Sequence, residues 1–225
     1  MSLAARLSAI DTRIAEAARQ AGREPAEITR IVVTKFHPID LVRELSELGV
    51  RDVGENRQQE LSAKRAEASG LDLRWHFIGQ AQTNKAAAIR RDADAVHSVD
   101  RIKLADALHR AAFDDGILDV LLQVNLTEDT GRGGASITEA EALAEHVLGL
   151  DSLRLRGLMA VAPLDEEPAR AFARVHDIAA RIRTVAPDAT WLSAGMSGDF
   201  VEAIAAGATH LRIGSAITGP RPDRG

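Results

Sequence analysis

The feature that most constrains this chain is the regular alternation of short apolar runs with alanine-rich amphipathic segments along its 225 residues. The first run, Ile31 to Val33, is continuous and β-branched, which is typical of a strand buried on both faces. Eight such runs occur, and no linker interrupts the series. The predicted strands cover residues 30–35, 50–54, 73–78, 95–98, 120–126, 153–161, 190–193 and 209–213.

The segments between these runs have helical periodicity, and several begin at Asp, Ser or Asn and end near Gly. After a leading helix within residues 1–22, predicted helices cover residues 38–49, 56–70, 100–112, 136–150, 167–185 and 198–207. Strands that alternate with helices favour a parallel sheet. Eight strands, without a G-x-G-x-x-G motif after the first, favour a single (β/α)8 TIM barrel with an extra N-terminal helix over an open Rossmann sheet. We predict one α/β domain over residues 1–225.

Composition excludes several classes of function. The net charge of −5 is mildly acidic and the basic residues are scattered, which disfavours a nucleic-acid-binding surface and favours a small-molecule partner. The absence of cysteine excludes disulfides, thiolate zinc sites and cysteine nucleophiles. Charges at Arg6, Asp11, Arg13, Glu16 and Arg19 interrupt the N-terminal segment, so we expect neither a signal peptide nor a membrane span. These observations predict a cytoplasmic protein.

The ends of the predicted strands indicate where chemistry takes place. In a (β/α)8 barrel the active site lies at the C-terminal ends of the strands, and side chains from several strands converge there. We therefore expect one shared mouth for the residues at or after these ends, which are Lys35, Glu55, Asn56, Gly79, Gln80, Asn84, Asn125, Met159, Ser193, Ser197, Arg212, Gly214 and Ser215.

Lys35 ends the first predicted strand, immediately before the sequence Phe-His-Pro. An amine at a buried strand end is a candidate for a Schiff base with an aldehyde, because desolvation and neighbouring cations favour its neutral, nucleophilic form. Two plainer interpretations stay open from position alone. Lys35 is then either a surface lysine at a strand terminus or the ion-pair partner of Glu55.

The stretch "LSAGMSGDFVEAIAAGATHLRIGSAITG" places glycines and small hydroxyl residues after two consecutive strands. Loops after the seventh and eighth strands of such barrels commonly bind phosphate through backbone amides. The natural contributors are Ser193, Gly195, Ser197, Gly214 and Ser215. The alternative is that these glycines only form turns. A lysine, a phosphate-binding loop and an aldehyde together indicate pyridoxal phosphate.

Arg212 occupies an internal position on the eighth predicted strand, where a buried guanidinium requires a partner. We expect that partner to be a pyridine nitrogen, which then cannot hold a proton of its own. The alternative is a salt bridge to Glu202 or Asp199. His76 lies between Trp75 and Phe77 and is interpreted as a hydrogen-bonded core histidine. The histidines are dispersed, and no metal triad emerges from the sequence.

The segments "VVTKFHP", "GENRQQE", "WHFIGQAQTNK", "VLLQVN", "RGLMAVAP" and the stretch ending in "RIGSAITG" together resemble the pyridoxal phosphate homeostasis proteins, which are single-domain relatives of the alanine racemase barrel. The resemblance implies a fold-type III barrel that holds pyridoxal 5'-phosphate as an aldimine of Lys35, with Arg212 facing the pyridine nitrogen. It implies a carrier or buffer of vitamin B6 without established catalytic turnover. The cofactor-binding residues that it indicates are Lys35, Asn56, Ser193, Met196, Ser197, Arg212, Gly214 and Ser215.

Two positions depart from the family pattern. Arg57 stands where many members have an aromatic residue, and "TGRGG" at residues 130–134 replaces a lysine-bearing segment after the fifth strand. The resemblance therefore does not imply a second lysine contact to the cofactor at that loop.

Two enzyme hypotheses compete with the carrier. Racemisation needs a second base, which is a tyrosine on an additional domain in the related racemases; this chain has no tyrosine, and about ten residues follow the eighth strand, so we expect no racemase activity. A Schiff-base aldolase acting on a phosphorylated aldehyde or ketone would need an acid or base such as Glu55, His76 or Asp199, and would be colourless. We favour a cofactor-binding protein that is a monomer, with PLP-dependent apoenzymes as candidate partners.

Overall fold

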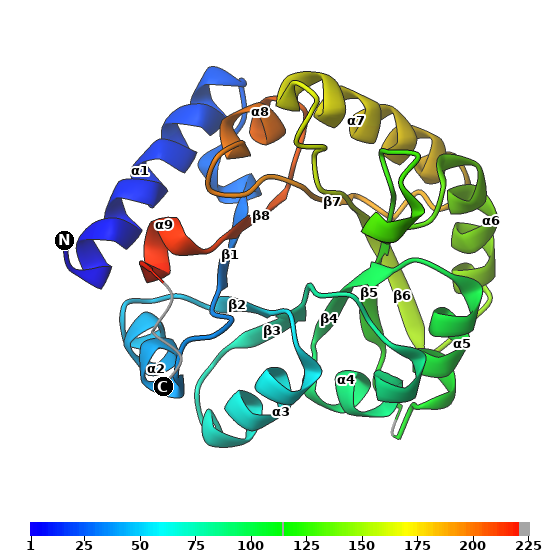
Figure 1. The fold of residues 1–225 in the computed structure, drawn as a ribbon, viewed down its shortest axis with the longest axis horizontal. Coiled ribbons are helices and arrows are strands. Elements are labelled where there is room, and N and C mark those ends of the chain that lie inside the picture. The colour runs from blue at the N-terminus through cyan, green and yellow to red at the C-terminus, as the bar shows by residue number, and fades with distance from the viewer. Residues whose placement is uncertain (114, 221–225) are drawn as a thin grey trace.

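Eight parallel strands form a closed barrel in the computed structural model, which describes residues 1–113 and 115–220 (Figure 1). The strands pair in sequential order, and β8 closes the barrel against β1. The predicted (β/α)8 barrel is therefore confirmed. The strands are β1 Thr29–Val33, β2 Asp52–Glu55, β3 Arg74–Phe77, β4 Ala95–Val99, β5 Leu118–Gln123, β6 Leu153–Met159, β7 Trp191–Ser193 and β8 His210–Ile213.

The helices form an outer ring around the strands (Figure 1). Their apolar faces and the outward faces of the strands make one buried core. The α-helices are α1 Leu3–Gln20, α2 Ile39–Glu47, α3 Gln58–Glu67, α4 Ala86–Asp92, α5 Ile102–Arg110, α6 Ile137–Leu148, α7 Pro168–Val185, α8 Phe200–Ala205 and α9 Ser215–Thr218; the 3-10 turns are η1 Pro25–Glu27, η2 Thr83–Lys85 and η3 Thr130–Arg132.

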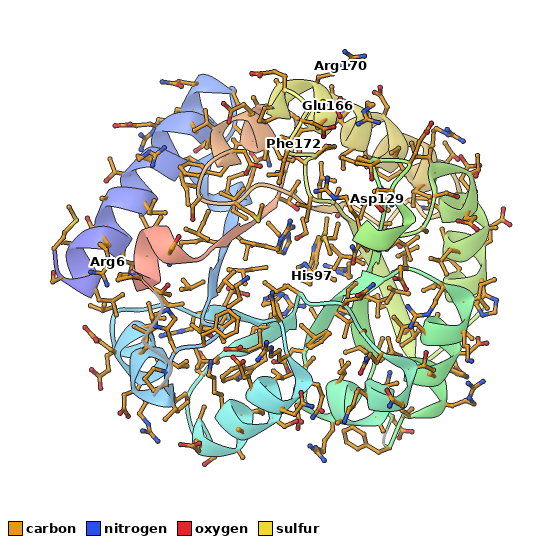
Figure 2. The ribbon with its side chains drawn as sticks, viewed as in Figure 1. Arg6, His97, Asp129, Glu166, Arg170 and Phe172 are labelled. Carbon is orange, nitrogen blue, oxygen red and sulfur yellow. The ribbon has the colours of Figure 1, made fainter. Side chains whose placement is uncertain are left out.

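The leading helix predicted from the sequence is α1. Ser2 caps it by accepting a hydrogen bond from the amide of Ala5, and Leu3, Leu7 and Ile10 begin its buried stripe. The helix packs against α8 and α9. Arg6 lies beside α9, and its Nε donates to the carbonyl oxygen of Ile217 at 2.6 Å (Figure 2). The leading helix thus supports the two short helices that follow the last two strands.

The predicted element boundaries differ from the observed ones in places. β1 ends at Val33, two residues before Lys35, and β6 ends at Met159 rather than at Val161. The helix α4 was not predicted, because seven residues contain too few turns to reveal a helical period. Among the described residues, no helix is long and apolar enough to cross a membrane. The last five residues of the domain predicted over 1–225, residues 221–225, lie outside the described part.

Candidate cofactor-binding site

A cavity of about 450 Å³ opens at the C-terminal ends of the strands, around the ends of β1, β2 and β8. Seven of the eight cofactor-binding residues indicated by the sequence line it, and Ser193 does not. The seven are Lys35, Asn56, Met196, Ser197, Arg212, Gly214 and Ser215.

The turn after β1 presents Lys35 to this cavity. Phe36 follows it with a φ of 68°, and it is the one non-glycine residue with positive φ in the described part of the chain. Oε2 of Glu60, on α3, accepts the Phe36 amide hydrogen at 2.8 Å. The Arg57 guanidinium lies 5.2 Å from the Phe36 ring centroid, and Nζ of Lys35 lies 6.0 Å from it. A strained turn held from α3 therefore sets the position of Lys35.

Glu55 is neither the ion-pair partner of Lys35 nor a residue of the mouth, so both of those interpretations were wrong. It is fully buried, and its Oε1 lies 2.6 Å from Nζ of Lys64 on α3. The hydroxyl of Thr34 donates to the same oxygen at 2.6 Å. Burial raises the pKa of Glu55, and the Lys64 charge opposes that shift. Side chains alternate between the two faces of a strand, and Glu55 faces the helices rather than the cavity.

Asn56 lines the cavity directly after β2, and Gly79 fixes its backbone. A Cβ at position 79 would lie 1.9 Å from the carbonyl oxygen of Asn56, so only glycine permits this approach. The remaining predicted rim residues from the central strands do not line the cavity. They are Gly79, Gln80, Asn84, Asn125 and Met159.

The turn after β7 contributes backbone donors. Gly195 has a φ of 91°, and a Cβ there would lie 2.7 Å from that of Ala203, so this position requires glycine. The Met196 amide donates to Oδ1 of Asp199 at 2.6 Å. Within the described residues, the amides of Ser197 and Gly198 have no protein acceptor. The turn therefore presents two amides and a hydroxyl at the cavity, next to Gly214 and Ser215.

Arg212 lies under the cavity, 5% exposed, and is held by backbone and hydroxyl oxygens. Its Nη1 donates to the carbonyl and hydroxyl oxygens of Ser193, both at 2.7 Å, and its Nη2 donates to the carbonyl of Ala160 at 2.9 Å. Burial lowers the pKa of Arg212 to about 10, which leaves it charged at neutral pH, and the Asp199 charge opposes the shift. Among the described residues, Arg212 donates to Ser193 and Ala160 and forms no salt bridge with Glu202 or Asp199, so that alternative was wrong.

Ser193 does not line the cavity, and it contacts Arg212 from the barrel interior. It is fully buried, and its hydroxyl oxygen accepts from Nη1 of Arg212 while lying 2.9 Å from Nδ1 of His97. His76 is also fully buried, with Nδ1 2.9 Å from Nε2 of His97 and Nε2 2.9 Å from Oδ1 of Asp52. The interpretation of His76 as a hydrogen-bonded core histidine is confirmed.

The sequence did not indicate several lining residues. They include Phe36, His37 and Thr218, and the apolar wall residues Val33, Ile78 and Val161. His37 is the imidazole of the cavity lining; burial, and then the charge of Lys64, lower its pKa. The sequence signal that could have indicated His37 as a lining residue is its position in "TKFHP", two residues after the candidate lysine. The conformation of the loops decides which of these side chains point into the cavity, and the spacing of apolar residues in the sequence does not predict loop conformation.

Comparison with known proteins shows which family the chain belongs to. Residues 5–222 match the family model described as "Alanine racemase, N-terminal domain". The pyridoxal phosphate homeostasis protein of Pseudomonas aeruginosa is 42% identical over 228 residues, which cover 98% of this chain and 96% of that protein.

Solved structures agree with this placement. PipY of Synechococcus elongatus, solved with PLP bound, is 35% identical, with a TM-score of 0.86 over 97% of this chain and 100% of that one. Alanine racemase from Corynebacterium glutamicum has a TM-score of 0.72 at 17% identity, over 96% of this chain and 61% of that one, and shows the shared fold alone. The chain belongs to the pyridoxal phosphate homeostasis protein family, which is built on the alanine racemase N-terminal barrel.

Proposed function

We propose that this protein binds pyridoxal 5'-phosphate (PLP) in the cavity at the strand ends and takes part in intracellular PLP homeostasis without catalytic turnover. The observation that carries the proposal is the convergence of an amine, a guanidinium and phosphate-type donors on one cavity of about 450 Å³. That volume lies within the range of ordinary small-molecule sites, about 300 to 1,000 Å³. PLP supplies an aldehyde that condenses with an amine, a pyridine nitrogen and a phosphate.

The donors in the cavity match these three groups. Lys35 provides the amine. The amides of Ser197 and Gly198 and the hydroxyls of Ser197 and Ser215 provide phosphate donors. Arg212 carries five N–H groups and uses three on described residues, which leaves two, one on Nε and one on Nη2. One of these would donate to the pyridine nitrogen and keep that nitrogen unprotonated.

The names of the relatives support homeostasis rather than catalysis. The protein of Pseudomonas aeruginosa is named a pyridoxal phosphate homeostasis protein, and PipY was solved with PLP bound. The sequence contains no tyrosine to act as the second base of a racemase. Of the three residues that an aldolase was expected to use, Glu55 and His76 are fully buried away from the cavity. We propose that the protein is not an enzyme.

We also propose the setting in which this function operates. The protein acts in the cytoplasm as one domain and as a monomer, and it exchanges PLP with PLP-dependent apoenzymes. The scattered basic residues support a small-molecule partner, and the absence of cysteine means that the fold needs no oxidising compartment.

Titration of the purified protein with PLP, followed by absorbance, tests binding. The wild type should develop a violet-absorbing band that borohydride removes. The Lys35→Ala variant should keep its fold and lose the band. Lys85→Ala is the matched control, because Lys85 lies after β3 outside the cavity lining, and it should behave like the wild type. A band that persists in Lys35→Ala would overturn the assignment.

Turnover assays with the PLP-loaded protein test the second half of the proposal. The rates of alanine racemisation and of aldol cleavage of a phosphorylated ketone should not exceed the rates measured with free PLP. Saturable turnover that disappears in Lys35→Ala would show that the protein is an enzyme.

A further inference from the structure

Five side chains, four of them buried, form a continuous chain of hydrogen bonds through the inside of the barrel, from Arg212 to the partly exposed Asp52. The hydroxyl of Ser193 lies 2.7 Å from Nη1 of Arg212 and 2.9 Å from Nδ1 of His97. Nε2 of His97 lies 2.9 Å from Nδ1 of His76, and Nε2 of His76 lies 2.9 Å from Oδ1 of Asp52. Figure 2 shows His97 at the centre of the ring of strands.

This chain of hydrogen bonds connects the two ends of the barrel. Arg212 lines the cavity at the C-terminal ends of the strands. Asp52 is the first residue of β2 and lines a separate cavity at the opposite end, together with Asp72 and His210. Ser193, His97 and His76 are each 0% exposed. Burial at this level means that water does not complete their hydrogen bonds, so each must use the protein partners.

With both histidines neutral, one set of proton positions satisfies every bond. The Asp52 carboxylate can only accept, so His76 carries its proton on Nε2 and donates it to Asp52. Nδ1 of His76 then accepts from Nε2 of His97. Nδ1 of His97 in turn accepts the hydroxyl hydrogen of Ser193, whose oxygen accepts from Arg212. All bonds therefore run in one direction, from the cation to the anion.

Both histidines must be neutral for this pattern, and their surroundings favour that state. The charged and titratable groups around His76 are Asp52, His97, Arg74, Asp94 and His210. Burial lowers the pKa of His76, although Asp52 opposes the shift. The neighbours of His97 are His76, His210, Arg212 and Arg74, and burial with these positive groups lowers its pKa well below the usual value.

We propose that Asp52, His76, His97 and Ser193 form a one-directional hydrogen-bond relay that positions Arg212 toward the ring nitrogen of PLP. The inference rests on the proposed function for its ligand, but the proton pattern is a property of the protein alone. The four are positioning residues, because none of them lines the cavity that would hold the cofactor. Asp52 acts from the far end of the barrel by fixing the tautomer of His76 and, through it, that of His97.

Nitrogen-15 NMR of the histidine-labelled protein without PLP tests the relay directly. Long-range proton–nitrogen correlations distinguish a protonated ring nitrogen from an unprotonated one, and the variants His76→Gln and His97→Gln assign the signals. Both rings should be neutral at pH 7.5 with the proton on Nε2. A proton on Nδ1 of His97, or a charged ring, would overturn the relay whether or not the protein binds PLP.

The variant Asp52→Ala tests whether the relay acts on the cofactor site. It should remove the single tautomer of His97 and weaken PLP binding about three- to tenfold. Asp72→Ala is the matched control, because this exposed aspartate lines the same lower cavity and pairs with Arg51 instead of the relay. In this control, the tautomers of His76 and His97 and the affinity for PLP should equal those of the wild type.

The outcomes separate the relay from the proposed function. Wild-type tautomers as expected with no PLP binding would contradict the proposed function and leave the relay in place. PLP affinity that is unchanged in Asp52→Ala, although the His97 tautomer changes, would refute positioning of Arg212. If Asp52→Ala does not fold, the wild-type NMR pattern and the variant Ser193→Ala, which should weaken PLP binding at least as much, decide the question.

Discussion

Lys35 and Lys64 carry the same ammonium group in opposite surroundings. Lys35 lines the cavity, whereas Lys64 is buried with Nζ 2.6 Å from Oε1 of Glu55 and 2.8 Å from the carbonyl oxygen of Thr34. The sequence places Glu55 one residue before a cavity residue and gives no sign of which lysine it pairs with. Glu55 pairs with Lys64 because its side chain points from β2 toward α3, which packs on the outside of the barrel.

Replacing Lys64 with methionine tests this pair. Removing one partner of a buried ion pair leaves a buried carboxyl without its cation, so Lys64→Met should lower the free energy of unfolding by about 3 to 5 kcal/mol. Lys103→Met, at an exposed position on α5, should change it by less than about 0.5 kcal/mol. Urea denaturation measures both. Equal stability of the two variants would show that the pair contributes nothing to the fold.

The sequence indicated Ser193 and Arg212 as site residues but did not show that they contact each other. Ser193 was grouped with the phosphate-binding residues because it precedes a glycine turn, yet it faces the barrel interior and holds Arg212. Arg212 itself was recognised because a buried guanidinium inside a strand is rare. The partner of a buried polar group is set by contacts between distant strands, and one sequence does not contain that information.

At the scale of elements, the strands were the most predictable feature. Short apolar runs located all eight, and strand ends located six of the residues that line the cavity, because parallel strands bring their C-terminal ends to one face. The loops were less predictable. The turn that presents Lys35 depends on Glu60 of α3, which lies 24 residues from its partner Phe36 along the chain.

The variant Glu60→Ala tests the contribution of α3 to this turn. Loss of a charged acceptor for the Phe36 amide removes about 1.5 to 3 kcal/mol of local stabilisation, so PLP binding should weaken about tenfold or more. Glu60→Gln retains an acceptor oxygen and should retain most of the affinity. Glu67→Ala, on the same helix at an exposed position, is the control. A PLP dissociation constant for Glu60→Ala equal to that of the control would contradict this role.

At the scale of the whole molecule, the barrel interior is polar and contains three buried histidines. They are His76, His97 and His210, and the ring of His210 lies 6.4 Å from each of the other two. Burial lowers the pKa of all three, that of His210 to about 3. The folded state therefore binds fewer protons than the unfolded state below the usual histidine pKa of 6.5.

This difference predicts acid sensitivity. Because the folded pKa values are depressed, the stabilisation is complete above pH 6.5 and is lost as the pH falls toward the folded values. His210, whose folded pKa is about 3, should by itself contribute a loss of about 2 kcal/mol between pH 8 and pH 5. Urea denaturation at several pH values measures the loss, and His210→Gln should reduce it by about 2 kcal/mol. A free energy of unfolding that is constant from pH 8 to pH 5 would contradict neutral burial.

The central claim is that Lys35 is the attachment point for PLP. The most direct measurement is borohydride reduction of the PLP-treated protein, followed by proteolysis and mass spectrometry of the peptides. The sequence contains four lysines, Lys35, Lys64, Lys85 and Lys103, and the site geometry predicts the phosphopyridoxyl group on Lys35 alone. A label on another lysine, or no label after incubation with excess PLP, would contradict it.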